Sequence, residues 1–245
     1  MGLSGESYNA ARAQFNTTHW TMVLQAARKH EPEQIRAMEE LCRIYWYPVY
    51  AFIRRQGFSV ADAEDCTQEF FQKLVAGTMM ETVAQERGQF RSFLLACCRH
   101  FASNFRDYQR AAKRGGGVSF LSIDIELAET LYRKEKISEP VERAFNNQWA
   151  TALVNHCRRL LEEDYRAAAK SGQIDLLLPF LLNAETHLAY QEIAQKLQTS
   201  PANVQVMLHR MRRRFRDILR REVRATLADP SELKNEIRFL LSVLD

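Results

Sequence analysis

Two segments of this chain concentrate positive charge in a way that suits phosphate binding. Residues 210–221 hold seven arginines and one aspartate, a net charge of +6. Residues 88–114 hold five arginines and one lysine against one aspartate, a net charge of +5. The whole 245-residue chain carries only +4, so the remainder sums to −7. Two separate basic surfaces on an acidic remainder indicate a nucleic-acid partner.

Aromatic residues are interleaved with the basic ones in residues 88–114. Bases of an opened strand can stack on such rings while arginines follow the backbone. Positions 93, 97, 101 and 105 repeat every fourth residue, so most of the rings must be core, which leaves one or two to meet a base. The rings are Phe90, Phe93, Phe101, Phe105 and Tyr108.

A third cluster is acidic: Asp62, Glu64, Asp65 and Glu69 stand against a single Lys73. Carboxylates can hold a catalytic metal, but neither a histidine nor a nucleophile accompanies these, and near a helix N-terminus they have an ordinary stabilising role. We therefore expect a negative helix face, with no catalytic residue, no metal and no cofactor. A nucleic-acid enzyme that uses these carboxylates is an alternative, which metal-dependent DNA cleavage would support.

The elements that must position these side chains are helices. Strand signals are nearly absent, whereas apolar residues recur at helical spacing in several segments, which predicts an all-α fold. Pro48 should kink or split the second segment. The predicted helical segments are 18–30, 33–56, 60–76, 90–113, 141–170, 187–224 and 231–244.

The chain should form two small helical domains joined by a flexible linker. Three consecutive glycines, mixed charges and a proline interrupt the helical pattern between residues 113 and 140. The predicted parts are therefore a domain at 1–114, a linker at 115–140, a domain at 141–226 and an amphipathic helix within 227–245. The apolar face of that last helix must be covered. Either it packs on its own domain, or it is a regulator-binding or self-inhibitory helix.

The five cysteines include no C-x-x-C pair and lie within apolar patterns, so we expect reduced, buried thiols in a cytoplasmic protein. The first residues show no signal-peptide pattern, and the longest apolar run, 176–182, is far shorter than the roughly 20 residues that a membrane helix needs. Membrane insertion is therefore not expected.

Residues 190–221 have the pattern of a helix-turn-helix. Ile193, Ala194 and Leu197 give one short helix a buried face, and Ser200 followed by Pro201 starts a second helix. On the face of the second helix opposite its apolar stripe, small and amide side chains come first and arginines come later. The small and amide side chains would reach base edges, and the arginines would reach phosphates. Ala202 and Val206 suit a thymine methyl, and Asn203 and Gln205 suit adenine. The alternatives are a stand-alone helix-turn-helix regulator of duplex DNA and an arginine helix that covers an acidic partner.

Three stretches resemble one family. "DAEDCTQEFFQKL" resembles the region 2 helix with which bacterial sigma-70-family factors bind the RNA polymerase clamp, and "FRSFLLACCRHFASNFRDYQRAAKR" resembles the adjacent helix that recognises and melts the minus-ten element. "AYQEIAQKLQTSPANVQVMLHRMRRRFRDIL" is similar to the region 4 helix-turn-helix that reads the minus-thirty-five element. Regions 2 and 4, without regions 1 and 3, are the layout of the extracytoplasmic-function (ECF) group.

The resemblance implies a site for each partner. Polymerase-clamp contacts would come from Asp62, Asp65, Gln68 and Glu69. The loop at 77–89 would receive a flipped-out base, and the minus-ten strand would meet Arg87, Gln89, Arg99, His100, Ser103, Asn104, Arg106 and Arg110. The minus-thirty-five duplex would meet Ser200, Ala202, Asn203, Gln205, Val206, His209, Arg210 and Arg213.

The same resemblance implies a non-enzymatic, monomeric initiation factor that binds the clamp and flap of core RNA polymerase together with promoter DNA. It leaves open an anti-sigma factor or another regulator as a further partner. Gln198 stands in the helix-turn-helix turn where the family usually has glycine, so this turn should be either strained or differently shaped. His100 stands where asparagine is common, so the promoter preference of relatives does not transfer.

Overall fold

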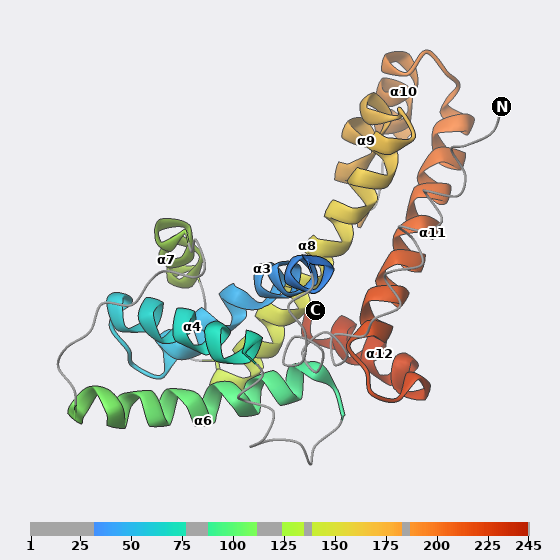
Figure 1. The fold of residues 1–245 in the computed structure, drawn as a ribbon. Helices are drawn as coiled ribbons and strands as arrows, with labels where there is room; N and C mark the ends of the chain where they lie inside the picture. The colour runs from blue at the N-terminus through green and yellow to red at the C-terminus, as the bar shows by residue number, and fades with distance from the viewer. Residues whose placement is uncertain (1–31, 77–87, 112–123, 135–138, 183–186, 245) are drawn as a thin grey trace. The chain divides into compact units, whose positions relative to one another are not determined.

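The computed structural model describes residues 32–76, 88–111, 124–134, 139–182 and 187–244. Within these residues the elements are α-helices and 3-10 turns, and the only β feature is one isolated bridge (Figure 1). The predicted all-α fold is confirmed. The elements are α3 (Pro32–Arg55), α4 (Val60–Val75), α6 (Phe90–Ala111), α7 (Ile125–Arg133), α8 (Val141–Ala167), α9 (Ser171–Leu177), η2 (Leu178–Phe180), α10 (His187–Lys196), α11 (Pro201–Ala225), η3 (Pro230–Glu232) and α12 (Leu233–Leu244).

The chain divides into two compact units. Unit 1 combines Met1–Ala152 with Val223–Asp245, and unit 2 is Leu153–Glu222. Helices α8 and α11 each contribute residues to both units. This division differs from the predicted domains at 1–114 and 141–226, because the start of α8 and the C-terminal residues belong with the N-terminal part of the chain. The predicted helix at 18–30 lies outside the described residues.

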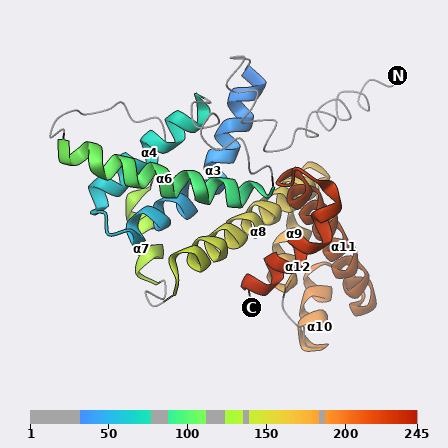
Figure 2. The same ribbon diagram turned by 90° about the horizontal axis from the view of Figure 1, so that it is seen from below.

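Unit 1 is built on α3, α4 and α6, which pack together (Figures 1 and 2). Aromatic rings connect them: the centroids of Phe70 and Phe101 are 5.7 Å apart, and those of Tyr45 and Phe90 are 5.3 Å apart. The start of α8 adds Phe145, whose ring lies 6.0 Å from that of Phe52. Edge-to-face pairs of this kind stabilise a core beyond the area they bury.

Helix α3 continues through Pro48, so of the two predicted effects of this proline, a kink or a split, the split does not occur. A proline inside a helix removes one hydrogen bond and costs about 3 kcal/mol. The neighbouring Tyr45, Val49 and Phe52 are almost completely buried. Each such side chain contributes roughly 1.5–3 kcal/mol on burial, which offsets the lost bond.

The predicted linker, 115–140, contains a helix that packs on unit 1. Asp124 caps α7 by accepting a hydrogen bond from the backbone N–H of Leu127 at 2.9 Å. Glu129 accepts hydrogen bonds from the Tyr50 hydroxyl and from Arg54 Nε, each at 2.7 Å. Residues 125–133 are therefore part of a folded unit rather than a flexible connection.

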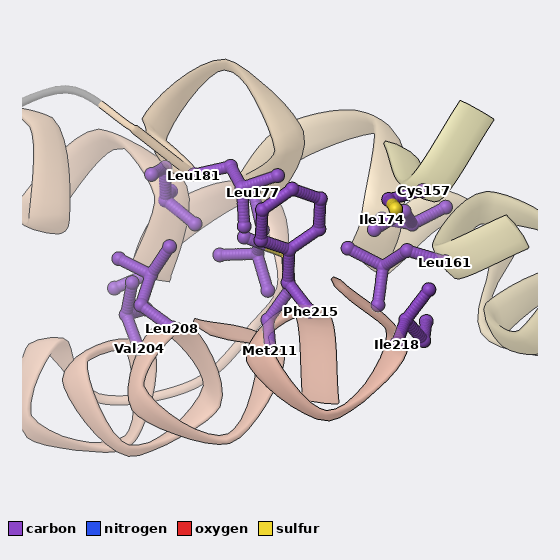
Figure 3. Close-up of a cluster of buried hydrophobic side chains, with 12 residues drawn as sticks. Cys157, Leu161, Ile174, Leu177, Leu181, Val204, Leu208, Met211, Phe215 and Ile218 are labelled. Carbon is purple, nitrogen blue, oxygen red and sulfur yellow. The ribbon is translucent and has the colours of Figure 1, made fainter. Parts of the chain in front are cut away.

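Unit 2 has its own apolar core, drawn in Figure 3. Val204, Leu208, Met211, Phe215 and Ile218 on α11 point toward side chains from α8, α9 and the residues that follow α9. This is the stripe that the helical spacing predicts for α11, so the face carrying the predicted DNA contacts lies on the opposite side of the helix.

Candidate nucleic-acid and protein interfaces

The arginines of residues 210–221 fall into two groups on α11. Three are engaged within unit 2. Arg212 Nη2 donates to the Phe180 carbonyl at 2.9 Å, Arg214 Nε to Asp164 at 2.7 Å, and Arg221 Nε to Glu222 at 2.8 Å. Burial alone would raise the pKa of Glu222, but hydrogen bonds from His156 and Arg221 hold that pKa below its usual range. About half of the arginine content of this segment therefore holds the unit together.

The other four arginines form an exposed stripe. Arg210, Arg213, Arg216 and Arg220 are exposed, and none of them makes an ion pair with another described residue. On an α-helix of 1.5 Å rise per residue, the line from residue 202 to residue 220 is about 27 Å long. A row of guanidinium groups on this line is suited to binding successive phosphates. We call these four residues, with the exposed residues at 200, 202, 203, 205, 206 and 209, the α11 face.

All eight residues of the predicted minus-thirty-five contact are exposed on the α11 face or at its start. Val206 is 44% exposed, so its side chain is accessible to a ligand. The eight are Ser200, Ala202, Asn203, Gln205, Val206, His209, Arg210 and Arg213.

The turn between α10 and α11 has defined hydrogen bonding at both ends. Helix α10 ends in a Schellman motif, in which Thr199 N–H donates to the Ala194 carbonyl at 2.9 Å and Gln198 N–H to the Gln195 carbonyl at 3.2 Å. Gln198 has φ of +50°, so the predicted strain at this position is present in the backbone. Ser200 then caps α11, with its Oγ accepting from Asn203 N–H at 3.2 Å.

The carboxylates of α4 lie on one side of the helix and its apolar residues on the other. Ser59 and Asp62 form a capping pair at the start of α4, since Asp62 N–H donates to Ser59 Oγ at 3.1 Å and Ser59 Oγ donates back to Asp62 Oδ2 at 2.6 Å. Asp65 is exposed, Gln68 and Glu69 are half-buried, and Glu69 is 2.8 Å from Lys73 Nζ. The spacing 62, 65, 68, 69 gives one continuous polar face that a partner protein could contact.

Helix α6 has a polar face at residues 99, 100, 103 and 104. His100, Ser103 and Asn104 are exposed, with Asn104 Nδ2 3.3 Å from His100 Nδ1. Arg99 pairs with Glu142 of α8. Arg106 donates to the Gln56 carbonyl, and its guanidinium lies 4.8 Å from the Phe58 ring centroid. The two arginines thus have partners within unit 1 and would have to exchange them for phosphates.

The four described rings of α6 are core residues. Phe90, Phe93, Phe101 and Phe105 are each at most 7% exposed, so none can stack on a base without leaving the core. The side chains of Tyr108 and Arg110 and the whole of Arg87 lie outside the described residues. The expectation of one or two free rings therefore gains no support from the part of α6 that is described.

Gln89 and Arg91, at the start of α6, belong to a polar network that the sequence did not reveal. Gln89 Oε1 accepts from Arg91 Nη2 at 2.8 Å, and Arg91 Nε donates to Glu236 Oε1 of α12 at 2.7 Å. Arg91 was one of the six cations counted in the +5 segment, yet its side chain is only 11% exposed. No local pattern links residues 91 and 236, because the two are 145 positions apart.

Comparison with protein-family models, curated proteins and solved structures returned no match for this chain. Among the described residues, no three His, Cys, Asp or Glu side chains are grouped closely enough to hold a metal ion. A helix long and apolar enough to cross a membrane is likewise not found in those residues.

Proposed function

We propose that this chain is a transcription initiation factor of the sigma-70 type, ECF group. In this proposal α4 binds core RNA polymerase, the exposed face of α6 meets the minus-ten strand, and the α11 face reads the minus-thirty-five duplex. Nucleotide addition belongs to the polymerase, so the chain needs no catalytic residue or cofactor of its own.

One observation supports the proposal above all others: the division of the arginines on α11. Arg212, Arg214 and Arg221 each have a carbonyl or carboxylate partner within unit 2, whereas the four arginines of the α11 face make no ion pair with a described residue. The α11 face has small and amide side chains at its start and unpaired guanidinium groups after them. A helix that served only to cover an acidic neighbour would not need this order. Contact with duplex DNA accounts for it, since small and amide side chains fit base edges and guanidinium groups bind phosphates.

The acidic face of α4 and the polar face of α6 favour an initiation factor over a stand-alone helix-turn-helix regulator. A regulator that bound duplex DNA alone would use the α11 face but would need neither of the other two. Their presence in unit 1, apart from the helix-turn-helix of unit 2, is the arrangement that a factor with one protein and two DNA contacts requires.

The test is transcription by purified bacterial core RNA polymerase from a pooled library of genomic fragments, with and without the full chain. We expect specific transcripts that depend on the chain, and these would also supply the promoter sequence. A chain that binds duplex DNA but neither binds core polymerase nor directs transcription would refute the proposal in favour of the stand-alone regulator.

Two pairs of variants assign the surfaces. Asp65→Lys should abolish binding to core polymerase, whereas Glu126→Lys, an exposed acid on α7 of the same unit, should not. Arg213→Ala should weaken duplex binding: the salt slope should fall by about 1 if Arg213 contacts a phosphate, or the loss should be about 1–3 kcal/mol if it pairs with a base. Arg158→Ala removes an equal charge from α8, where Arg158 pairs with Glu162, and should change neither. Full promoter-directed transcription by Asp65→Lys and Arg213→Ala would refute these residue assignments.

A further inference from the structure

The C-terminal segment is bonded to the residues that begin α6. Phe90 N–H donates to the Thr226 carbonyl at 2.8 Å, and Ala228 N–H donates to the Gly88 carbonyl at 3.2 Å. Between these bonds, Gln89 and Leu227 form the isolated antiparallel bridge. The backbone on either side of Gln89 is therefore held by residues 226–228.

Helix α12, which follows that segment, places a fully buried carboxylate beside Arg91. Glu236 is 0% exposed and accepts from Arg91 Nε at 2.7 Å and from Nη2 at 3.3 Å. The Arg91 guanidinium lies 3.7 Å from the Phe239 ring centroid and 5.4 Å from that of Trp149. Arg91 Nη1 donates to Asn146 Oδ1 at 3.1 Å. With a carboxylate, an amide and two rings around it, the guanidinium has one fixed position.

That position determines how the Gln89 side chain is oriented. Arg91 Nη2 donates to Gln89 Oε1 at 2.8 Å, and Ser92 Oγ donates to the same oxygen at 3.3 Å. Guanidinium nitrogens can only donate, so the amide oxygen of Gln89 must face Arg91 and its NH₂ group must face away. Gln89 consequently offers hydrogen-bond donors, and no free acceptor, to a ligand.

We infer that Glu236 is a positioning residue for Gln89, acting through Arg91, and that it thereby restricts which unpaired base Gln89 can accept. The inference rests on the proposed function, in which Gln89 meets the minus-ten strand. A free glutamine amide recognises adenine with one donor and one acceptor together. With its amide oxygen occupied, Gln89 can only donate, to an acceptor such as thymine O4 or guanine O6. Adenine then loses one of the two hydrogen bonds that a free glutamine amide would make with it.

The test uses the full chain with core RNA polymerase and a promoter recovered from the transcription experiment above. Each unpaired minus-ten position is changed to all four bases, and transcript yield is measured for wild type, Gln89→Ala, Glu236→Gln and the double variant. We expect wild type to disfavour adenine against thymine or guanine at one position by about five-fold or more, the range of one lost base contact. Glu236→Gln should reduce that preference substantially, and should have no further effect on it when Gln89 is already alanine.

Two further variants separate positioning from folding. Arg91→Met with Glu236→Met removes both charges while retaining apolar volume, a change that buried pairs often tolerate, so it should fold and show the same loss of preference. Leu241→Ala, at a position 53% exposed on the same helix, should leave the preference unchanged.

The outcomes separate the two hypotheses. If wild type directs transcription but Glu236→Gln keeps the wild-type base preference, or shifts it equally in the Gln89→Ala background, the positioning role is refuted and the proposed function stands. If wild type neither binds core polymerase nor directs transcription, the proposed function fails and the role of Glu236 fails with it.

Discussion

Replacing Gln198 by glycine should stabilise unit 2. A non-glycine residue in the left-handed region costs roughly 1–2 kcal/mol, and glycine loses about 0.5–1 kcal/mol more conformational entropy on folding than other residues. Gln198 has φ of +50°, and its side chain is exposed, so little packing is lost with it. The expected net gain is about 0.5–1 kcal/mol in the free energy of unfolding of unit 2.

The chain provides an internal control for this measurement. Its three tryptophans are at 20, 46 and 149, so unit 2 (Leu153–Glu222) contains none, and tryptophan fluorescence during urea unfolding does not report unit 2. Native-state hydrogen exchange of the amides in the α11 stripe reports unit 2. Gln198→Gly should slow that exchange by about two- to five-fold, which corresponds to the expected gain, and leave the fluorescence midpoint unchanged.

Two companion variants show whether backbone conformation is the cause. Gln198→Ala keeps the left-handed cost and should behave like wild type, whereas Lys196→Gly, at the last residue of α10, should destabilise by about 0.5–1 kcal/mol. The second Schellman turn offers a repeat, because Ala169 has φ of +56° and Lys170 N–H donates to the Tyr165 carbonyl at 2.9 Å. Backbone strain at Gln198 would be refuted if Gln198→Gly destabilised unit 2, or if Gln198→Ala stabilised unit 2 as much as Gln198→Gly does.

Two other predictions follow from the pKa shifts. Hydrogen bonds from Arg54 hold the pKa of Glu129 below its usual range. The stability that Glu129 provides is therefore present above about pH 4.5 and is lost as the pH falls through the folded-state pKa. The difference in urea midpoint between wild type and Glu129→Gln should narrow from about pH 6 to about pH 3.5, and a constant difference would contradict this. Burial raises the pKa of Cys42 and Cys97 to about 12 and that of Cys66, Cys98 and Cys157 as well. All five thiols should resist iodoacetamide in the folded chain and react after denaturation, as intact-mass measurement would show, and labelling of any one in the native state would contradict its burial.

The sequence predicted the helices whose signals are local. Ser59 and Ser200 mark the starts of α4 and α11, and the stripe from Val204 to Ile218 has the spacing of one buried helix face. The five cysteines lie buried, as their apolar surroundings predicted. These features depend on residues within one or two turns of one another, so periodicity and capping rules suffice to find them.

Features that depend on distant partners were not predicted. Helix α7 has only nine residues, and its attachment depends on Tyr50 and Arg54, more than 70 positions earlier. Counting charge also could not separate Arg213 from Arg214, which are neighbours in sequence, because only the fold brings Asp164 to the second of them. The C-terminal helix was expected either to pack on its own domain or to be a regulator-binding or self-inhibitory helix. Its residues belong to unit 1, an assignment that no local pattern indicated.

Unit 1 is formed by two segments that are far apart in the sequence, and this affects how the chain folds during synthesis. Its first part ends at Ala152, and its last part begins only at Val223, after the whole of unit 2. At roughly 5–20 residues per second, the ribosome needs about 5–20 seconds to synthesise residues 153–245. During that interval unit 2 can fold as a continuous segment while Arg91 still lacks its carboxylate. We therefore expect unit 1 to complete its folding after unit 2. A chain that terminates early would have an incomplete unit 1, which proteases should degrade before the chain can bind the partners of the full-length protein.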